Sequence, residues 1–361
     1  MIRTLIVEDS LVVQQLLRHI LESDPHITVV GVANNGQEAL PAVMSLKPDV
    51  VTMDIHMPKL DGFEATRLIM AHRPTPIVIV SGGSDVNEVH FSFQAVEVGA
   101  LAVISRPPGP GHPDHPAAAR ELVQTVKLMS EVRVVTRKPR PAPAPTSLAL
   151  ANTPPLVHQT EVAAIGASTG GPVILKQILS RLPANLPFPI LIAQHIAEGF
   201  VAGFVEWLAD VARFPLRIAR HGDPLWPGCG YLAPDGFHLG VKPGPRLVLS
   251  DHAPEYSVRP SVAYLFRTVA EVFGPRAVGV LLTGMGSDGA RELGLMRQRG
   301  AITLAQDQAS SVIYGMPGAA AALGAAIHIL PPEGIAAFIA TLAKKTKGAN
   351  HGHPEQRPGP A

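Results

Sequence analysis

A serine in a glycine-rich turn is the first residue of this chain that could do chemistry. Four apolar residues at 162–165 are typical of a short buried strand, and Ser168 follows in the pattern Gly-x-Ser-x-Gly. Pro172 then opens a helical pattern, so Ser168 is predicted to lie between a strand and the positive end of a helix. That position suits a nucleophile whose product is an oxyanion. Taken alone, the motif does not establish that Ser168 is catalytic, because a glycine-rich turn after a strand also serves packing or phosphate binding.

Two more residues could complete a serine hydrolase site. His195 comes directly after the apolar strand predicted at 190–193, and Asp288 lies in a glycine-rich stretch after another at 277–282. Parallel strands end at one edge of a sheet, so the three side chains can converge there. A serine hydroxyl needs a base to take its proton, imidazole suits that role, and a carboxylate orients the imidazole. The turn at Met285 could direct a backbone N–H at an oxyanion.

Other residues of the second half compete for these roles. The rival histidines are His221, His238, His252 and His328, and the rival acids are Asp223, Asp235, Asp251 and Asp307. The rival acids resemble turn formers. An α/β-hydrolase order of serine, acid and histidine would need His328 as the base, inside an apolar strand. We therefore prefer His195, but spacing alone leaves the assignment open.

Polar residues also gather at predicted strand ends in the first half. Glu8 and Asp9 follow the first strand, Asp54 the third, Ser81 ends the fourth and Arg106 follows the fifth. Carboxylates at one rim suit Mg²⁺, and a carboxylate beside Mg²⁺ can attack a phosphoryl donor. The acids could instead cap the following helices. For the set as a whole we favour the cation site.

The alternation of short apolar runs with helical patterns predicts an α/β protein with two parallel-sheet doubly wound domains. Residues 1–132 form the first, flavodoxin-like domain, and residues 161–346 the second, Rossmann-like domain. Residues 133–160 are rich in proline and predict a semi-rigid linker between them. The tail at 347–361, rich in glycine, proline and histidine, is predicted to be disordered.

Composition excludes several classes of protein. The 361 residues carry 30 basic and 29 acidic side chains, which argues against a dedicated nucleic-acid binder. A single cysteine excludes an internal disulfide and a cysteine metal cluster. The N-terminus lacks a signal-peptide pattern, and no apolar run reaches the ~20 residues that span a bilayer. We expect a soluble cytoplasmic protein without membrane insertion.

The first half resembles the receiver domain of two-component response regulators. The resemblance rests on the acidic pair and on the segment Asp54-Ile55-His56-Met57-Pro58-Lys59-Leu60-Asp61-Gly62. It implies that Asp54 is the phosphoacceptor. Glu8, Asp9, Asp54 and the backbone carbonyl of His56 would hold the Mg²⁺ that phosphorylation needs.

The resemblance also assigns a switch and shows one departure. Ser81 matches the switch hydroxyl of receivers. Receivers place lysine before proline at the end of the fifth strand, whereas this chain has Arg106. Arginine keeps the charge but is a bulkier planar fork, so the sequence leaves the effect on phosphorylation open.

The second half resembles the catalytic domain of the chemotaxis protein-glutamate methylesterase family. Its matching segments are Gly166-Ala167-Ser168-Thr169-Gly170-Gly171, Gln194-His195, Arg259-Pro260-Ser261-Val262, Leu282-Thr283-Gly284-Met285-Gly286-Ser287-Asp288-Gly289-Ala290 and Tyr314-Gly315-Met316-Pro317. The order of receiver, linker and esterase matches as well, so the resemblance covers nearly the whole chain. It implies Ser168 as nucleophile, His195 as base and Asp288 as orienting carboxylate. Met285 would support the oxyanion and Thr169 the site.

This resemblance implies hydrolysis of glutamyl methyl esters on methyl-accepting chemoreceptors, with release of methanol and no cofactor in the catalytic domain. Deamidation of receptor glutamines would use the same chemistry. A chemotaxis histidine kinase would phosphorylate the receiver, which covers the esterase cleft until then. Two alternatives remain in the sequence. One is an enzyme of the same fold acting on a non-chemotaxis signalling substrate, and the other is a regulator that only binds a partner.

Overall fold

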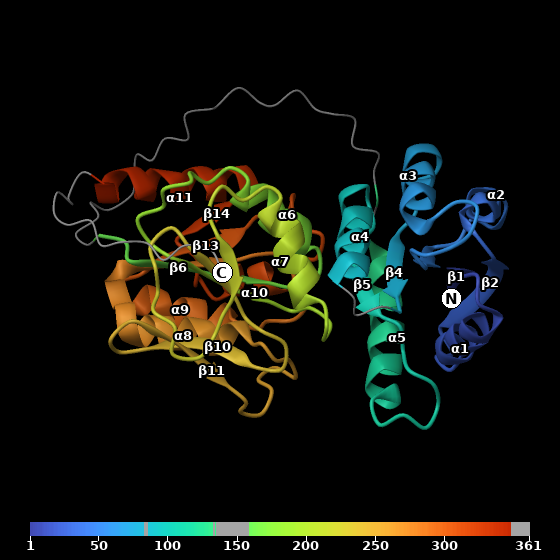
Figure 1. Ribbon diagram of the computed structural model, residues 1–361, viewed down its shortest axis with the longest axis horizontal. Coiled ribbons are helices and arrows are strands. Elements are labelled where there is room, and N and C mark those ends of the chain that lie inside the picture. Colours follow the sequence, from blue (N-terminus) through green and yellow to red (C-terminus); the bar gives the residue numbers. More distant parts are fainter. Residues whose placement is uncertain (83–85, 133, 135–158, 348–361) are drawn as a thin grey trace.

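The computed structural model describes residues 1–82, 86–132, 134 and 159–347. The predicted tail and nearly all of the predicted linker lie outside these residues. The domain boundaries at 132/133, 160/161 and 346/347 therefore stay predictions. Two bodies built on separate sheets stand side by side in Figure 1, one from each half of the chain.

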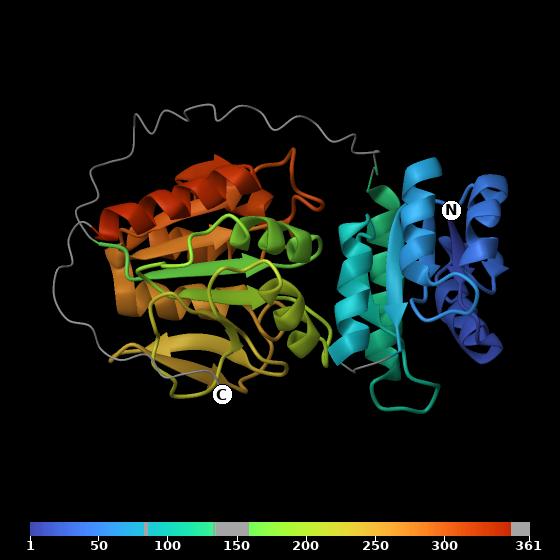
Figure 2. The ribbon, with the colours of Figure 1, turned by 45° about the horizontal axis from the view of Figure 1, so that its top comes forward.

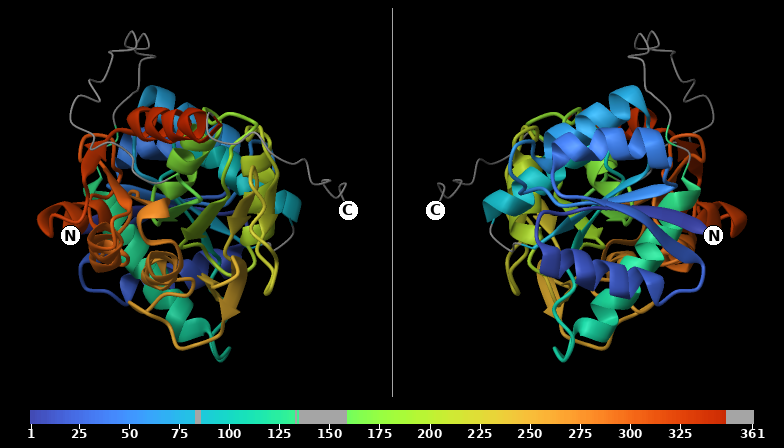
Figure 3. Two further views of the ribbon diagram at one scale, coloured as in Figure 1. Left: turned by 90° about the vertical axis from the view of Figure 1, so that its left-hand side faces the viewer. Right: turned by 90° about the vertical axis from the view of Figure 1, so that its right-hand side faces the viewer.

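The first body is a five-stranded parallel sheet in the order β2-β1-β3-β4-β5, with helices on both faces (Figures 1 and 3). Its strands are β1 (Ile2–Val7), β2 (Ile27–Ala33), β3 (Val50–Met53), β4 (Ile77–Ser81) and β5 (Ala102–Ser105). Its helices are α1 (Leu11–Glu22), α2 (Gly36–Leu46), α3 (Gly62–His72), α4 (Val86–Glu97) and α5 (His115–Glu131). The order reverses at β1, and the acids that follow β1 and β3 lie at that crevice, where doubly wound sheets bind ligands.

The second body is a seven-stranded parallel sheet in the order β14-β13-β12-β6-β7-β9-β8 (Figure 2). Its strands are β6 (Val162–Ala167), β7 (Ile190–Gln194), β8 (Leu216–Ile218), β9 (Gly230–Leu232), β12 (Ala277–Leu281), β13 (Ile302–Gln306) and β14 (His328–Leu330). Its helices are α6 (Gly171–Leu179), α7 (Val201–Ala209), α8 (Val262–Phe273), α9 (Ala290–Gln298), α10 (Met316–Ala322) and α11 (Pro332–Lys347), with a 3₁₀ turn at Gly274–Arg276. The predicted α/β class with two parallel sheets is confirmed.

One pair of strands departs from the predicted parallel arrangement. β10 (His238–Lys242) and β11 (Arg246–Ser250) form a separate antiparallel ribbon. Only three residues join them, whereas a parallel pair needs a crossover of a dozen or more. Gly244 supplies the left-handed turn with a φ of 86°. The ribbon packs against α8, next to the sheet edge that carries the site.

The central strands are buried on both faces, which explains their continuous apolar runs. Every residue of β6, β7 and β12 is buried. Gly166 in β6 has a packing role, because a Cβ there would lie 2.2 Å from Cγ1 of Val262. Its missing side chain lets the first turn of α8 approach the end of β6. A strand and a helix distant in sequence thus meet at the carboxyl edge of the second sheet.

Two helix starts of the first body show different local chemistry. Ser10 occupies the N-cap of α1, but its side chain makes no capping hydrogen bond. Helix α5 begins at His115 with Pro116 in its first turn. Proline is tolerated there because its missing N–H would have no partner within the helix.

The two bodies contact each other through α4 of the first and α6 and α7 of the second (Figures 1 and 2). Phe93 of α4 lies 4.9 Å from Phe204 and 5.3 Å from Trp207, measured between ring centroids. Lys176 of α6 lies over the Trp207 ring at 4.2 Å and pairs with Glu97 of α4. We call Phe93, Phe204 and Trp207 the aromatic contact. Among the described residues, no helix combines the length and apolar character needed to cross a membrane.

Candidate functional site

The ends of three adjacent strands bring Ser168, His195 and Asp288 into one site. β6 lies between β12 and β7, so the turns that follow them share one edge. The backbone N–H of Ser168 donates to the carbonyl of Thr283 at 3.0 Å, and that of His195 donates to the carbonyl of Ala167 at 2.9 Å. These bonds continue the sheet ladder one residue past each strand and fix where the side chains start.

Asp288 is held by four hydrogen bonds. His195 Nε2 lies 2.9 Å from its Oδ2, and Val262 N donates to the same oxygen at 2.7 Å. Ser261 Oγ and Ala263 N each donate to Oδ1 at 2.9 Å. Three of these donors belong to the N-cap and first turn of α8, where the helix dipole favours a negative charge. Burial raises the pKa of Asp288, but the bond and charge of His195 and the α8 N–H donors outweigh it, so the pKa lies below its usual value.

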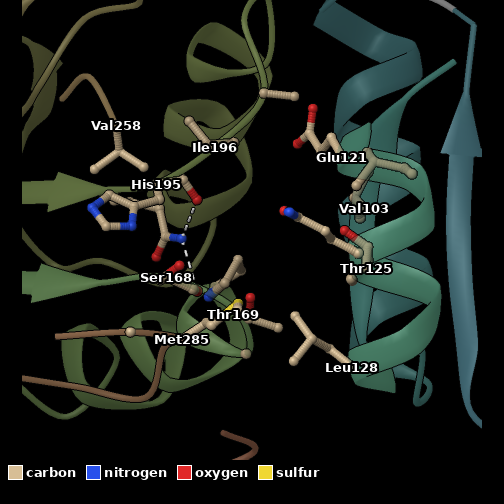
Figure 4. Close-up of a pocket in the computed structure, with 18 of the residues that line it drawn as sticks. Val103, Glu121, Thr125, Leu128, Ser168, Thr169, His195, Ile196, Val258 and Met285 are labelled. Atoms are coloured by element: carbon tan, nitrogen blue, oxygen red, sulfur yellow. Dashed lines mark hydrogen bonds between the residues drawn. The ribbon is translucent and has the colours of Figure 1, made fainter. Parts of the chain in front are cut away.

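The imidazole orientation assigns the two ring nitrogens. Since Nε2 of His195 faces Asp288, Nδ1 is the nitrogen left to take a proton. Ser168 is 9% exposed, and its hydroxyl makes no hydrogen bond within the described part of the chain. Hydrogen bonds between nucleophile and base often close only in the substrate complex. His195 and Asp288 are therefore joined by a hydrogen bond. Ser168 lies close to His195 (Figure 4).

Gln194 is a residue of the site to which the sequence assigned no role. Its Nε2 donates to the backbone carbonyl of Ser168 at 2.9 Å and to that of His195 at 2.7 Å, drawn as dashed lines in Figure 4. The side chain is 5% exposed. One amide group therefore ties the nucleophile turn to the histidine. Its position next to His195 in the sequence was the one indication that Gln194 belongs to the site, and only the fold shows which atoms its amide group joins.

Thr283 holds the same turn from the other side. Its Oγ1 lies 3.0 Å from the carbonyl oxygen of Thr169 and 3.1 Å from that of Ile313, so its one O–H can donate to either of them. Its backbone N–H donates to Gln306 Oε1 at 2.8 Å. Thr169 therefore lies beside Ser168 with its carbonyl fixed by Thr283. Met285 lies at the rim and is 48% exposed. Its backbone N–H has no partner among the described residues, so it is free to bind an oxyanion.

Three of the rival residues, His238, His328 and Asp307, have other places in the structure. His238 is fully buried, with Nε2 donating to Ala253 O and Nδ1 accepting from Ser261 N. It stands behind Ser261, which supports Asp288, so it is a support of the site and not its base. His328 lies in edge strand β14. Asp307 accepts from Ser310 N as a turn former, as the sequence predicted.

A cavity of about 570 Å³ between the two bodies contains the site. Ser168, Thr169, His195 and Met285 line one side, and residues of α5 line the other (Figure 4). Glu121, Thr125 and Leu128 of α5 face the catalytic residues across this space. Burial alone raises the pKa of Glu121. Helix α5 therefore borders the space in front of Ser168.

A second site lies at the carboxyl edge of the first sheet, where the strand order reverses. One carboxylate oxygen each of Glu8, Asp9 and Asp54 lies within 4.8 Å of the others. Burial, and next the Asp54 carboxylate, raise the pKa of Glu8 to about 7. Burial also raises the pKa of Asp54, although Arg106 opposes it. Clustered carboxylates with raised pKa values are expected in a site that binds a divalent cation, because the positive charge of the cation would offset their mutual repulsion.

The residues around this cluster fit a hard cation. Glu8 Oε2 is buried and has no hydrogen-bond partner within the described ranges, so an oxygen ligand is left over. Arg106 Nη2 lies 3.5 Å from it and 3.4 Å from Asp54 Oδ2. Ser81 is buried at the end of β4. The backbone N–H of Arg106 donates to the backbone carbonyl of Ser81 at 2.7 Å. His56 follows Asp54 with an exposed side chain, as expected if only its carbonyl is used.

Fold and site together define a two-part signalling hydrolase, with an acidic receiver-type site on one sheet and a Ser–His–Asp constellation on the other. Comparison with known proteins agrees. Residues 4–112 match the model of the response regulator receiver domain, and residues 163–339 match that of the CheB methylesterase. The chain belongs to the CheB methylesterase family.

Relatives align over nearly the full length. A protein-glutamate methylesterase/protein-glutamine glutaminase of Syntrophus aciditrophicus is 51% identical over 95% of this chain and 99% of its own. One of Nitrosospira multiformis is 52% identical over 95% of this chain and 97% of its own. The crystal structure of the Thermotoga maritima CheB methylesterase catalytic domain matches with a TM-score of 0.50 and 32% identity, covering 51% of this chain and all of that one. The family resemblance seen in the sequence is confirmed.

Proposed function

We propose that this protein is a phosphorylation-regulated protein-glutamate methylesterase that acts on chemoreceptors. The observation that carries the proposal is the hydrogen bond between His195 and an ionised, buried Asp288, one strand away from Ser168. That arrangement holds an imidazole with one free ring nitrogen beside a serine. The names of the relatives supply the substrate class, a glutamyl side chain in a protein.

The reaction follows from this arrangement. Ser168 Oγ attacks the ester carbonyl carbon while Nδ1 of His195 takes its proton. The carbonyl oxygen becomes an oxyanion that the N–H of Met285 stabilises. The intermediate collapses and methanol leaves with the proton from His195. Water then attacks the acyl-serine by the same route, which returns Ser168 and leaves a glutamate.

The same residues would deamidate glutamine. An amide passes through the same tetrahedral oxyanion, with ammonia leaving in place of methanol. The relatives' names include glutaminase activity, which supports this second reaction on receptor glutamines. The catalytic side chains described above complete both reactions without a cofactor.

The receiver would regulate access. Mg²⁺ would be held by Glu8, Asp9, Asp54 and the His56 carbonyl, and it would neutralise charge while Asp54 accepts a phosphoryl group from a histidine kinase. Helix α5 faces the catalytic cavity, and α4 holds the two bodies together at the aromatic contact. Ser81 and Arg106 would respond to the phosphoryl group and change these contacts. The proposed substrate is the cytoplasmic helical region of a receptor, which places the reaction in the cytoplasm.

The test is methanol release from methylated receptor membranes by the intact protein, with and without acetyl phosphate and Mg²⁺. Release should rise with the phosphodonor and vanish in Ser168→Ala. A matched control is Ser45→Ala, at an exposed serine near the end of α2 that lines neither site. No release from any receptor would contradict the proposal and favour a different substrate or a binding-only regulator. Release that ignores the phosphodonor would keep the esterase and remove the control by phosphorylation.

A further inference from the structure

The acidic site of the first body contains Arg106 at the position where receivers have a lysine. The structure shows which neighbouring residue leaves room for its guanidinium. Gly82 directly follows Ser81, and an ideal Cβ on it would lie 2.7 Å from Cζ and 2.8 Å from Nη1 of Arg106. Contacts under 3.0 Å do not occur between a real Cβ and its neighbours. The guanidinium therefore fills the space that a side chain at 82 would take.

Glycine is not required at 82 for backbone reasons. Its φ lies outside the left-handed region, where several other glycines of the chain are found. Alanine could adopt the same backbone. A Cβ at 82 would meet the movable end of a side chain, so the guanidinium would be displaced while the fold is kept. The absence of a side chain at 82 thus controls where Arg106 lies.

The guanidinium is near its acidic neighbours but not tightly bonded to them. Nη2 lies 3.5 Å from Glu8 Oε2 and 3.4 Å from Asp54 Oδ2, whereas charge-assisted bonds measure ~2.7–2.9 Å. Nε is buried and has no hydrogen-bond partner in the described structure. Arginine presents several donors in a plane that matches phosphoryl oxygens, which a lysine ammonium does not. Donors remain for a new anion on Asp54.

We propose that Gly82 and Arg106 act as a pair, in which the missing side chain at 82 positions a guanidinium fork to bind the phosphoryl group on Asp54. Gly82 is the positioning residue, and Arg106 makes the contact. The proposal rests on the proposed role of Asp54 as phosphoacceptor. In that step an Asp54 carboxylate oxygen forms a bond to phosphorus, the bond from phosphorus to the donor oxygen breaks, and acetate leaves acetyl phosphate with the electron pair.

A double-mutant cycle on the intact protein tests the pair through binding and not through esterase activity. Beryllium fluoride with Mg²⁺ mimics the phosphoryl group on an aspartate, and ¹⁹F NMR reports its affinity. Gly82→Ala should weaken binding about tenfold in the natural chain, because it displaces a charge-assisted contact. The same change combined with Arg106→Lys should weaken it less than about twofold relative to Arg106→Lys alone, because the slender ammonium leaves room for the Cβ.

Gly109→Ala is the matched control, since a Cβ there has nothing within 4 Å, and it should leave the affinity unchanged. Arg106→Met, which removes the fork and keeps Gly82, should weaken binding about as much as Gly82→Ala. Thermal melting of each variant checks that the fold is kept. Equal weakening by Gly82→Ala in both backgrounds, or none in either, would overturn the pair while leaving Asp54 as phosphoacceptor. Failure of the natural chain to bind, as in Asp54→Asn, would remove the phosphoacceptor and the pair together.

Discussion

Asp54 and Asp288 both follow central strands of parallel sheets, and both side chains are buried, yet their surroundings are opposite. Asp288 accepts four hydrogen bonds, three of them from the start of α8, and its pKa is lowered. Asp54 shares its space with two other carboxylates and a loosely placed guanidinium, and its pKa is raised.

The difference separates a carboxylate that holds its partner in place from a carboxylate that is available to react. A carboxylate whose oxygens are fully bonded stays ionised and holds its partner still, which suits the orientation of His195. A carboxylate left short of positive charge gains by binding a cation or by accepting a phosphoryl group. The same residue type at the same kind of strand end thus suits two different roles, because burial, neighbouring charges and hydrogen-bond donors differ around it.

The largest expected effect separates the two aspartates by activity. Asp288→Asn should lower methyl ester hydrolysis by roughly 10³- to 10⁴-fold, because the imidazole loses its tautomer and its counter-charge. Asp54→Asn should leave basal hydrolysis within about twofold and remove only the response to acetyl phosphate. Methanol release measures both. More than a tenth of normal activity in Asp288→Asn would break the comparison.

The second effect concerns stability and pH. A lowered carboxyl pKa contributes stability that is fully present above the unfolded value of about 4 and is lost as the pH falls through the native pKa. Asp288→Asn should therefore unfold more easily than the natural chain at pH 7, by about 2 kcal/mol from its lost charge-assisted bonds. The gap should narrow below about pH 4. Denaturant melts at pH 7 and pH 3.5 test this, and a gap that widens in acid would contradict it.

The third effect tests the amide that holds the site. Gln194→Met keeps the length of the side chain but removes the donors to the Ser168 and His195 carbonyls. We expect kcat to fall about tenfold with KM nearly unchanged, because two hydrogen bonds of about 1 kcal/mol hold reacting groups and not substrate. Gln298→Met, on the exposed surface of α9, is the control. An increase in KM alone would assign Gln194 to substrate binding.

The smallest effect concerns the contact that joins the two bodies. Phe93→Ala removes one ring of the aromatic contact and should raise hydrolysis by the unphosphorylated protein about three- to tenfold, since such ring pairs contribute about 1 kcal/mol. Phe91→Ala is matched, because Phe91 lies on the same helix but is 49% exposed and packs near His56. Equal activity of the two variants would mean that this contact does not restrain the enzyme.

Much of the fold and of the candidate site follows from local sequence. Apolar runs and glycine-rich turns indicate where the strands end. Because parallel strands end at one edge of a sheet, the sequence alone predicts that Ser168, His195 and Asp288 lie close together. The acids after β1 and β3 followed by the same reasoning. Family resemblance then chose among histidines that spacing could not separate.

Tertiary structure decided the rest, because it depends on atoms far apart in the chain. No periodicity reveals that the first turn of α8 supplies three donors to Asp288, or that His238 supports Ser261. The antiparallel pairing of β10 with β11 also needs the structure, because a strand pattern does not state its partner. The sequence by itself determined which residues reach each edge, since local dihedral preferences and hydrophobic period act over a few residues. Only packing decided which carboxylate is satisfied and which remains ready to react, since burial and the donors and charges brought by distant segments together set the direction of each pKa shift.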